Sequence, residues 1–525
     1  MPGPADQYTK APVGGTNAST ALVLALVFAL SVAVRAPRLA SPLARHHEAV
    51  TGHALRILEI WREEGGARCR FLPIMNYGRA ADKNIPNHAT TLRDAQGNYY
   101  DGSYGPLAYI APYCLFTALG TRPNELGIRL FGLLVHLLTA VLVYAIVNLL
   151  VRTPGDRLPW PAIGAFSVYA LNPLALWCHM SVYSVDTVVQ PLFAGGIYLA
   201  LLVMTKRGRS TLLLPALAAL TCAMVLTEWL GVFLAFSVAA YGLWRIRGSE
   251  GRRLALWVAA AAAAGAIVLA AWYSEPAGLR AFWRECVGKY EVRSGLARQT
   301  DEAMSYANPR SVLYVGYYVY QSFAPMLAAL ALVWIGIRRL RPPVDRVRRP
   351  CIGPGGMLAL YLATVPALLH HLAFYNFTAI HDFALVKDVL PLSIATGLLL
   401  GCLLARTKET QERAARRTAK AAGVVVALAL AAGVARYWWQ NSRPGDEWCL
   451  PVAAAVRRAA ADDEVVFLKG PFTTQMVWYS GRNIASYTTL EEALRLIKMN
   501  GVHRGVLFIV DPRTKQLVQI AHIHA

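Results

Sequence analysis

The stretch LGIRLFGLLVHLLTAVLVYAIVNLL (126–150) is apolar except for Arg129 and a few weakly polar side chains. An apolar run of about 17–25 residues is long enough to cross the ~30 Å hydrocarbon core of a bilayer as an α-helix. Further runs of this kind lie near residues 19–36, 160–178, 186–205, 210–225, 228–244, 254–273, 311–337, 354–371, 383–404 and 421–437. The chain is therefore predicted to be a polytopic α-helical membrane protein with about eleven transmembrane helices.

The composition agrees with this prediction and excludes an ordinary soluble enzyme. Hydrophobic residues make up 56% of the 525 residues and charged residues only 16%, against about 25% charged residues in average soluble domains. The net charge of +21 could suggest a nucleic-acid partner, but the basic residues gather in short clusters between the apolar runs, at 206–209, 245–253, 338–349 and 406–420. Such clusters mark cytoplasmic loops, since Lys and Arg resist translocation, and we expect no nucleic-acid partner.

The basic clusters also predict the orientation in the membrane. The first apolar run, 19–36, is longer than the roughly 7–15-residue apolar core of a signal peptide, so it is interpreted as a retained first helix. With the N-terminus in the cytoplasm, all four clusters and the turn 151–157 fall on the cytoplasmic side. We therefore predict a multi-pass protein of the cell (plasma or inner) membrane, with a cytoplasmic N-terminus and an extracytoplasmic C-terminal domain.

Two domains follow from the same pattern. Residues 1–437 form the transmembrane domain, with outer loops 38–125 and 274–310. The segment 104–120 is apolar but short and contains two prolines, so it is expected to lie along the outer membrane surface. Residues 438–525 are predicted to be a small α/β domain with strands at 464–470, 505–511 and 516–523 and helices at 451–461 and 489–501.

Ionisable residues within or beside membrane spans are costly and are functional candidates by default. In this chain they gather in the loops that are predicted to face outward. They are Glu48, Asp101, Tyr104, His179, Asp186, Glu228, His381, Asp382 and Lys387. Because separate outer loops supply acids, imidazoles and cations to one face, this pattern indicates a functional site there.

Structural explanations stay open for individual residues. Asp186 and Glu228 open predicted helices, where carboxylates meet the positive end of the helix dipole. Asp101 fits a turn, Glu48 fits the start of a helix, and the pair 370–371 fits solvated loop histidines.

A metal site is a second alternative at the first loop. His46 and His47 precede Glu48, and imidazole and carboxylate suit divalent cations. Adjacent positions lack the i, i+4 spacing that aims two helical histidines at one ion. We therefore assign no metal ligand and keep a divalent cation as an alternative. No nucleotide-binding motif is present, which argues against a nucleotide-driven pump.

The arrangement resembles the GT-C membrane glycosyltransferases, especially bacterial protein O-mannosyltransferases and the lipid A aminoarabinose and galacturonic acid transferases. The resemblance covers nearly the whole chain. It rests on HHEAVTGH (46–53), DGSYGPLAYIAPYCLFTALG (101–120), NELGIRLFGLLVHLLTAVLVYAIV (124–147), YSVDTVVQPLF (183–193) and HDFALVKDVLPLSIATGLLLG (381–401). The chain departs from the family pattern where one Glu48 follows two histidines, and where DGSYGPL replaces the usual His-Pro-Pro.

The resemblance implies a sugar donor linked to polyprenyl phosphate, delivered from the membrane lipid phase, and an extracytoplasmic acceptor such as a glycolipid, polysaccharide or protein. Inverting transfer needs a general base, for which Glu48 is the candidate, with Asp186 as the second catalytic residue. The phosphate leaving group needs cations or hydrogen-bond donors, for which Lys387 and His381, with Lys289 or Arg293, are the candidates. The remaining candidates for substrate binding are His46, His47, Asp101, Tyr104, His179, Glu228, Lys289, Arg293, His381, Asp382 and Lys387.

Two other functions remain possible from the sequence. A lipid or sugar transporter or flippase would use the same outward charges as a gate, but it would also place ionisable residues near mid-membrane and show inverted repeats. A non-catalytic assembly subunit would tolerate the loss of Glu48. For the glycosyltransferase, the basic loop 274–310 is expected to be mobile and to close over the donor.

Overall fold

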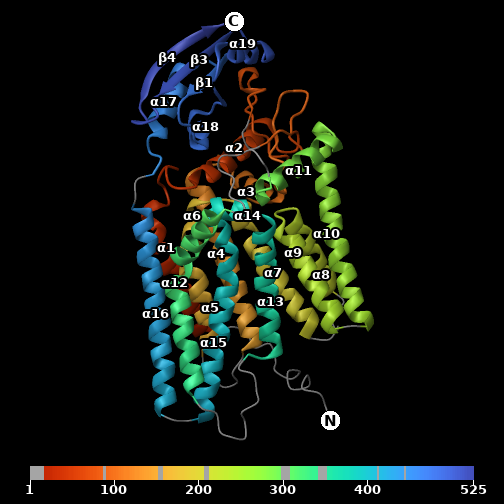
Figure 1. The fold of residues 1–525 in the computed structure, drawn as a ribbon, viewed down its shortest axis with the longest axis vertical. Helices are drawn as coiled ribbons and strands as arrows, with labels where there is room; N and C mark the ends of the chain where they lie inside the picture. Colours follow the sequence, from red (N-terminus) through yellow and green to blue (C-terminus); the bar gives the residue numbers. More distant parts are fainter. Residues whose placement is uncertain are drawn as a thin grey trace.

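The computed structural model describes residues 17–86, 90–151, 158–205, 212–246, 248–296, 308–340, 352–410, 413–442 and 445–525. A long helical bundle carries a small sheet domain at one end (Figure 1). The first half of the bundle contains α1 (Ala18–Arg35), η2 (Ala36–Arg38), α2 (Glu48–Glu64), η3 (Ala80–Asp82), α3 (Leu107–Ala118), α4 (Glu125–Leu150), α5 (Trp160–Leu171), α6 (Pro173–Ser181) and α7 (Val185–Thr205). The second half contains α8 (Leu213–Val225), α9 (Leu230–Tyr241), η4 (Gly242–Ile246), α10 (Gly248–Ala277), α11 (Leu279–Ser294), α12 (Pro309–Arg339), α13 (Pro354–Ala373), α14 (Tyr375–Ile380), η6 (Asp382–Asp388), α15 (Val389–Thr410) and α16 (Arg413–Asn441).

Eight helical segments in the described residues are long and apolar enough to cross a membrane. They are Ala18–Arg38, Glu125–Leu150, Val185–Thr205, Gly248–Ala277, Pro309–Arg339, Pro354–Ala373, Asp382–Lys408 and Arg413–Asn441. The protein is thus a multi-pass α-helical membrane protein, as the apolar runs predict.

The predicted span 160–178 is a bent pair of helices. α5 and α6 meet at 53°. The break falls where Pro173 lacks a backbone N–H and the Asn172 side chain accepts a hydrogen bond from Leu174 N at 2.9 Å, which starts a new helix.

The predicted spans 210–225 and 228–244 are shorter than the other membrane helices. They correspond to α8 and to α9 with its π-helical extension η4. Both pack against α10. The eleven predicted spans therefore correspond to eight long segments, one bent pair and two short apolar helices. The predicted basic stretch 206–209, residues 152–157 of the predicted turn and residues 341–349 of the third cluster lie outside the described residues.

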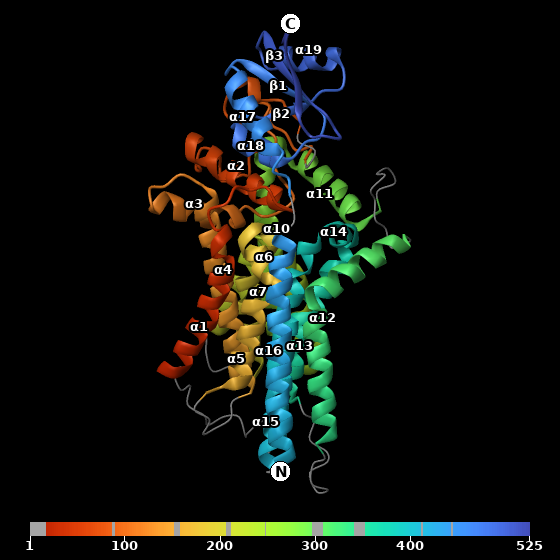
Figure 2. The same ribbon diagram turned by 90° about the vertical axis from the view of Figure 1, so that its left-hand side faces the viewer.

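The segments that the sequence predicts to be outer loops contain more helix than the sequence indicated. α2 and α3 run across the long axis of the bundle near the sheet domain (Figure 2). The stretch 274–310, predicted as a mobile loop, is helical over α11, which is bounded by Gly278 (φ 85°) and Gly295 (φ 79°). The α11 helix buries Phe282, which stacks on Tyr273 with ring centroids 5.7 Å apart. Residues 297–307 of the predicted loop lie outside the described residues.

The C-terminal domain is the predicted small α/β unit. It contains α17 (Cys449–Ala459), β1 (Glu464–Lys469), α18 (Thr474–Ser480), β2 (Ile484–Ser486), α19 (Leu490–Met499), β3 (Arg504–Val510) and β4 (Leu517–His524). The strand order is β2-β1-β3-β4; β1 pairs in parallel with β2 and β3, and β4 is antiparallel to β3. The three predicted strands and two predicted helices are present, and the short β2 and α18 are additional.

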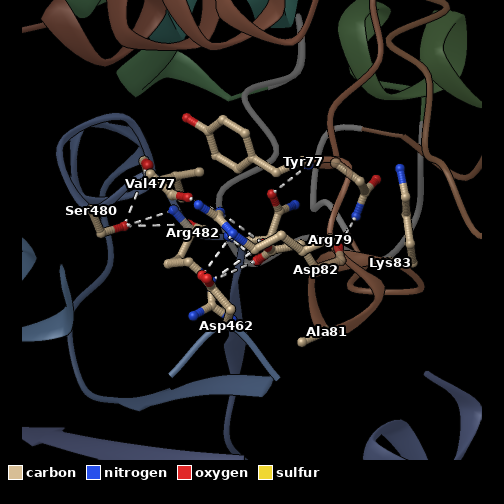
Figure 3. Close-up of polar contacts among 12 residues, drawn as sticks. Tyr77, Arg79, Ala81, Asp82, Lys83, Asp462, Val477, Ser480 and Arg482 are labelled. Atoms are coloured by element: carbon tan, nitrogen blue, oxygen red, sulfur yellow. Dashed lines mark hydrogen bonds and ion pairs between the residues drawn. The ribbon is translucent and has the colours of Figure 1, made fainter. Parts of the chain in front are cut away.

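A buried ion pair fixes this domain to the outer segment between α2 and α3 (Figure 3). The Nε atom of Arg482 lies 3.3 Å from Asp82 Oδ2, and the backbone N–H of Asn483 donates to Asp82 Oδ1 at 2.7 Å. Asp82 and Arg482 are both buried. The sheet domain is therefore held directly on the end of the bundle that carries the predicted site residues.

Candidate functional site

The predicted site residues lie in several small groups at the end of the bundle where α2, α3, α11 and α14 meet the membrane helices (Figure 1). Each group pairs an acid with a cation or an imidazole contributed by a distant part of the chain. The acids are Glu48, Asp101, Asp186, Glu228 and Asp382.

Glu48 is the first residue of α2 and is only 2% exposed. Its Oε1 atom accepts a hydrogen bond from Arg129 Nη2 at 3.0 Å, and its Oε2 atom accepts from the backbone N–H groups of Ala44 and Arg45, both at 2.8 Å. Arg129 in α4 is also buried. The carboxylate therefore has the helix-start position that the sequence left open, and it also forms a buried ion pair that the sequence did not indicate.

Asp382 opens η6 and faces two histidines of the first loop. His46 Nε2 lies 3.5 Å from Asp382 Oδ2, and His47 Nε2 lies 3.3 Å from Asp382 Oδ1. The hydrogen bond to Asp382 raises the pKa of His46. His381 lies beside this group, with its ring centroid 5.3 Å from that of His47. Burial, together with His47 and Arg293, lowers the pKa of His381 to about 3, so this imidazole is neutral at physiological pH.

Asp101 brings the DGSYG motif together with α2 and α11. Lys289 Nζ lies 3.7 Å from Asp101 Oδ1, and His53 Nε2 lies 3.2 Å from Asp101 Oδ2. Burial alone would raise the pKa of Asp101, but Lys289, His53 and the Ser103 hydrogen bond outweigh it and hold that pKa well below its usual range. Asp101 is thus an ionised group in a charged cluster rather than a simple turn residue.

Arg293 of α11 lies over the Tyr104 ring, with 4.3 Å between the guanidinium carbon and the ring centroid. The same group is 5.5 Å from the Phe377 ring of α14. The motif approaches the end of α8 closely, because a Cβ on Gly105 would overlap the carbonyl oxygen of Leu226. A residue without a side chain is therefore required at this position.

Two acids at the starts of membrane helices form buried ion pairs. Lys387 donates to Asp186 Oδ1, and His370 Nε2 lies 2.7 Å from Glu228 Oε1. Asp186 is in the first turn of α7, and Glu228 accepts from the backbone N–H of Leu230 at 2.6 Å, so both also have the predicted helix-opening positions. The interpretation of position 370 as a solvated loop histidine is wrong: His370 is buried within α13.

Tyr104 connects these groups electrostatically. Burial raises the pKa of its phenol, Arg293 opposes this effect, and Asp186, Glu228 and Asp101 reinforce it. The pKa of the Tyr104 phenol therefore depends on acids of the first loop, of α7 and of the α8–α9 connection.

His179 does not join them. It is buried in α6, its ring stacks on that of His136 with centroids 4.5 Å apart, and its Nε2 atom lies 3.1 Å from the Tyr169 hydroxyl. Arg35 Nη1 lies 3.0 Å from His136 Nδ1. This places His179 in a polar cluster inside the bundle, which the sequence pattern did not reveal.

Arg129 and His53 are also missed members of the site region. Both lie within stretches that suggest a membrane span or an ordinary helix. Arg129 could have been identified from the sequence, because it is the one charged residue in an otherwise apolar span. A charged side chain within a membrane span usually pairs with another polar group.

Two side-chain groups in the described residues have ligand atoms close enough to share a metal ion, with all atoms of a group within 4.8 Å of one another. One consists of His46, His47 and Asp382; the other consists of Asp186, Glu228 and His370. Two surface hollows lie apart from these groups, on the outer segments. Their volumes are about 290 Å³, against Trp478 of α18, and about 690 Å³, against Cys69.

Comparison with known proteins places the fold. No protein-family model matches the chain, and no curated protein matches it. Among solved structures, ArnT from Cupriavidus metallidurans in the apo state is similar over 95% of this chain and 94% of its own, with a TM-score of 0.55 and 15% identity. The Archaeoglobus fulgidus oligosaccharyltransferase in complex with Zn and sulfate is similar over 93% of this chain and 68% of its own, with a TM-score of 0.57 and 11% identity.

This chain shares its fold with ArnT and with the archaeal oligosaccharyltransferase. The resemblance stated from the sequence motifs is confirmed at the level of the fold, over nearly the whole chain. ArnT is also similar in its structure bound to undecaprenyl phosphate, with a TM-score of 0.54 and 14% identity over 94% of this chain. At these identities, the likeness shows the fold alone.

Proposed function

We propose that this protein is an integral-membrane glycosyltransferase that moves a sugar from a polyprenyl-phosphate donor to an extracytoplasmic acceptor. The observation that carries the proposal is that α11 brings Lys289 and Arg293 onto the DGSYG motif within a GT-C fold. One of the similar structures is of ArnT with undecaprenyl phosphate bound, and such a lipid phosphate is the leaving group that the proposed reaction releases.

The leaving phosphate develops negative charge, which preorganised cations stabilise. Lys289 and Arg293 are the proposed phosphate partners. Lys289 lies between two acids, 3.7 Å from Asp101 and 3.6 Å from Glu285. These two acids restrict the Lys289 side chain to few rotamers. Its ammonium group is therefore already oriented before a phosphate binds.

Glu48 remains the proposed general base. Its hydrogen bonds restrict which of its two carboxylate oxygens can accept the proton. The acceptor hydroxyl has to reach Oε1, since Oε2 already accepts two backbone N–H groups. Arg129 shares Oε1, and a carboxylate oxygen can accept a second hydrogen bond. Asp186 is proposed to act through Lys387, its buried partner, by fixing the position of that cation near the donor.

The proposed orientation puts the sheet domain and all these groups on the extracytoplasmic side. The start of α10 and the start of α16, which carry the basic residues of 248–253 and 413–420, lie at the opposite end of the bundle from the sheet domain (Figure 1), which supports this assignment. A membrane-impermeant thiol reagent should label a Thr514→Cys variant in intact cells, with the wild-type chain as background control. Thr514 is exposed in the turn before β4. Labelling only after permeabilisation would reverse the orientation.

The direct test of the activity is a donor panel. Purified protein in lipid vesicles is incubated with polyprenyl-phosphate hexoses, pentoses and aminosugars and with membrane extracts as acceptors. Donor-dependent release of polyprenyl phosphate, absent from a Lys289→Ala, Arg293→Ala double variant, is expected. The Arg280→Ala, Arg284→Ala variant is the matched control, because both arginines are exposed on the same helix.

The transporter alternative predicts a different outcome of this experiment. The buried cluster of Arg35, His136 and His179 places ionisable groups inside the bundle, which a transporter pathway also requires. If the donor crosses the vesicle membrane and its sugar–phosphate bond stays intact with every acceptor, the protein is a flippase and the glycosyltransferase proposal fails.

A further inference from the structure

The first loop and the start of η6 together form a compact group of imidazole and carboxylate ligands. His46 and His47 come from the turn before α2, and His381 and Asp382 come from the junction of α14 and η6. We propose that His46, His47 and Asp382 bind a divalent metal ion of the zinc class, since their ligand atoms all lie within 4.8 Å of one another. The two histidines stand where this chain departs from the GT-C motif.

The separations between the ligand atoms fit one tetrahedral ion. Nitrogen and oxygen ligands at about 2.0–2.2 Å from zinc lie about 3.4 Å from one another in a tetrahedron. His46 Nε2 lies 3.5 Å from Asp382 Oδ2, and His47 Nε2 lies 3.3 Å from Asp382 Oδ1. With one ligand atom from each residue, all separations are within 4.8 Å. An ion could therefore be held by these side chains with small movements only.

Polar atoms in this group lack the hydrogen bonds that buried atoms require. Among the residues that the structure describes, His47 Nε2 and Asp382 Oδ1 are buried and lie 3.3 Å apart, but they do not form a hydrogen bond of good geometry. Nearly all buried polar atoms in native proteins are satisfied. A cation between these two atoms would satisfy both.

The backbone conformation of His47 explains how two histidines at adjacent positions can bind one ion. Adjacent side chains normally diverge, but His47 has φ 57° and ψ 6°, a left-handed conformation that is uncommon for a residue other than glycine. As a result, the rings of His46 and His47 lie side by side, with centroids 3.9 Å apart. Strained backbone of this kind is concentrated at functional sites.

The ligand set differs from the HHE run of the sequence. Glu48 is excluded because Arg129 and two backbone N–H groups hold its carboxylate. Asp382 replaces it, contributed by a residue far along the chain. Neutral imidazoles with one carboxylate suit zinc better than magnesium or calcium, which prefer oxygen ligands.

The second group of possible ligands, around Asp186, is a poorer candidate. Lys387 already places its ammonium group on the Asp186 carboxylate, and His370 already bonds to Glu228. A cation there would have to displace a buried lysine. Within the part of the chain that the structure describes, the ion pairs of Asp382 are with His46 and His47 and not with a lysine or arginine.

The test measures metal binding alone, without donor or acceptor. Purified full-length protein in detergent is stripped with a chelator, dialysed against zinc chloride and analysed for bound zinc by mass spectrometry. Cobalt(II) is added in parallel, because a tetrahedral nitrogen–oxygen site gives it strong visible absorption. One zinc per chain and that absorption are expected for the wild type.

The variants are His46→Ala, His47→Ala and Asp382→Asn, with His522→Ala as the matched control. His46 is 68% exposed at its side chain, so its removal leaves the fold intact and keeps the test valid if the other two variants fail to fold. His46→Ala should weaken zinc binding at least about 10-fold, and His522→Ala, in the sheet domain, should not change it.

The proposal is overturned if the wild type binds no zinc, or if His46→Ala retains wild-type zinc affinity and the cobalt spectrum. These outcomes are independent of the proposed activity. A chain that binds zinc but transfers no sugar would overturn only the glycosyltransferase, and one that transfers sugar but binds no metal would overturn only this site.

Discussion

Arg129 of α4 donates a hydrogen bond from Nη2 to Glu48 Oε1 over 3.0 Å, and neither side chain has appreciable contact with solvent. The Nη1 atom of Arg129 also donates to the carbonyl oxygens of Arg38 and Leu39 at 3.0 and 3.1 Å. One guanidinium therefore joins the end of the first span, the start of α2 and α4. This pair positions the proposed base relative to the membrane helices.

The first prediction separates the catalytic role of Glu48 from its structural role. Glu48→Gln keeps the shape and the acceptor oxygen but loses proton acceptance, so turnover should fall by about 10²-fold or more while donor binding persists. Steady-state rates and donor-binding isotherms of purified protein measure the two effects.

The matched variant is Arg129→Gln, which leaves Glu48 buried without its cation. Removing one partner of a buried pair costs about 3–5 kcal/mol, so this variant should lower the thermal unfolding midpoint more than Glu48→Gln does. If Glu48→Gln keeps more than half of wild-type turnover, the base assignment is wrong and Glu48 is only an anchor.

The second prediction concerns the cations of α11. Lys289→Ala and Arg293→Ala should each weaken donor binding by about 10–100-fold, since a hydrogen bond to a charged group contributes about 1.5–3 kcal/mol. Titration of a fluorescent polyprenyl phosphate into purified protein measures this. Arg280→Ala removes an equal charge from an exposed position of the same helix and should have little effect. Equal weakening by Arg280→Ala would indicate a general charge effect rather than a phosphate site.

Long-range pairing explains most of what the sequence could not predict. The spans and the strands β1, β3 and β4 were predictable because apolar periodicity is a local signal. The three-residue β2 is too short to give one, and α11 has a charged composition that resembles a loop. Glu48 and Arg129 stand 81 positions apart, and nothing local indicates which distant cation a carboxylate will meet.

The outer acids illustrate the same limit. Their location on one face was predictable from the topology, but their partners were not. Asp382 meets His47 rather than solvent, and His179 turns into the bundle toward His136. The left-handed backbone conformation of His47 was also not predictable from the sequence. Most positions with this conformation are occupied by glycine, so a histidine gives no sign of it.

The third prediction addresses the attachment of the sheet domain. Arg482→Leu leaves Asp82 buried without its guanidinium partner, which should cost about 3–5 kcal/mol. Burial already raises the pKa of Asp82 in spite of Arg482, so an unpaired carboxylate there is strongly disfavoured. Thermal unfolding and protease cleavage before α17 measure the loss. Asp82→Asn combined with Arg482→Leu should recover part of the stability, and a double variant as unstable as Arg482→Leu alone would show that the pair does not hold the domain.

The last prediction concerns pH and His53. Burial, only partly offset by Asp101, lowers the pKa of His53, and the neighbouring cations Arg56 and Lys289 lower it further. The folded protein therefore keeps this imidazole neutral, while the unfolded chain takes up its proton at about pH 6.5. Below that pH the unfolded state binds more protons than the folded state. The free energy of unfolding should therefore decrease as the pH is lowered, by at most about 1.4 kcal/mol per pH unit for this residue.

His53→Gln removes the titrating group and retains a donor toward Asp101. Its unfolding free energy should therefore depend less steeply on pH than that of the wild type between about pH 6.5 and the lower pKa of folded His53. Denaturant unfolding in detergent at a series of pH values measures both slopes, with His522→Gln, a half-exposed histidine of β4, as the control. In His522→Gln, His53 is still present, so its contribution to the pH dependence of the unfolding free energy should remain. If His53→Gln and the wild type lose stability equally as the pH falls, His53 is protonated in the folded protein and the charge balance around Asp101 differs from the one described.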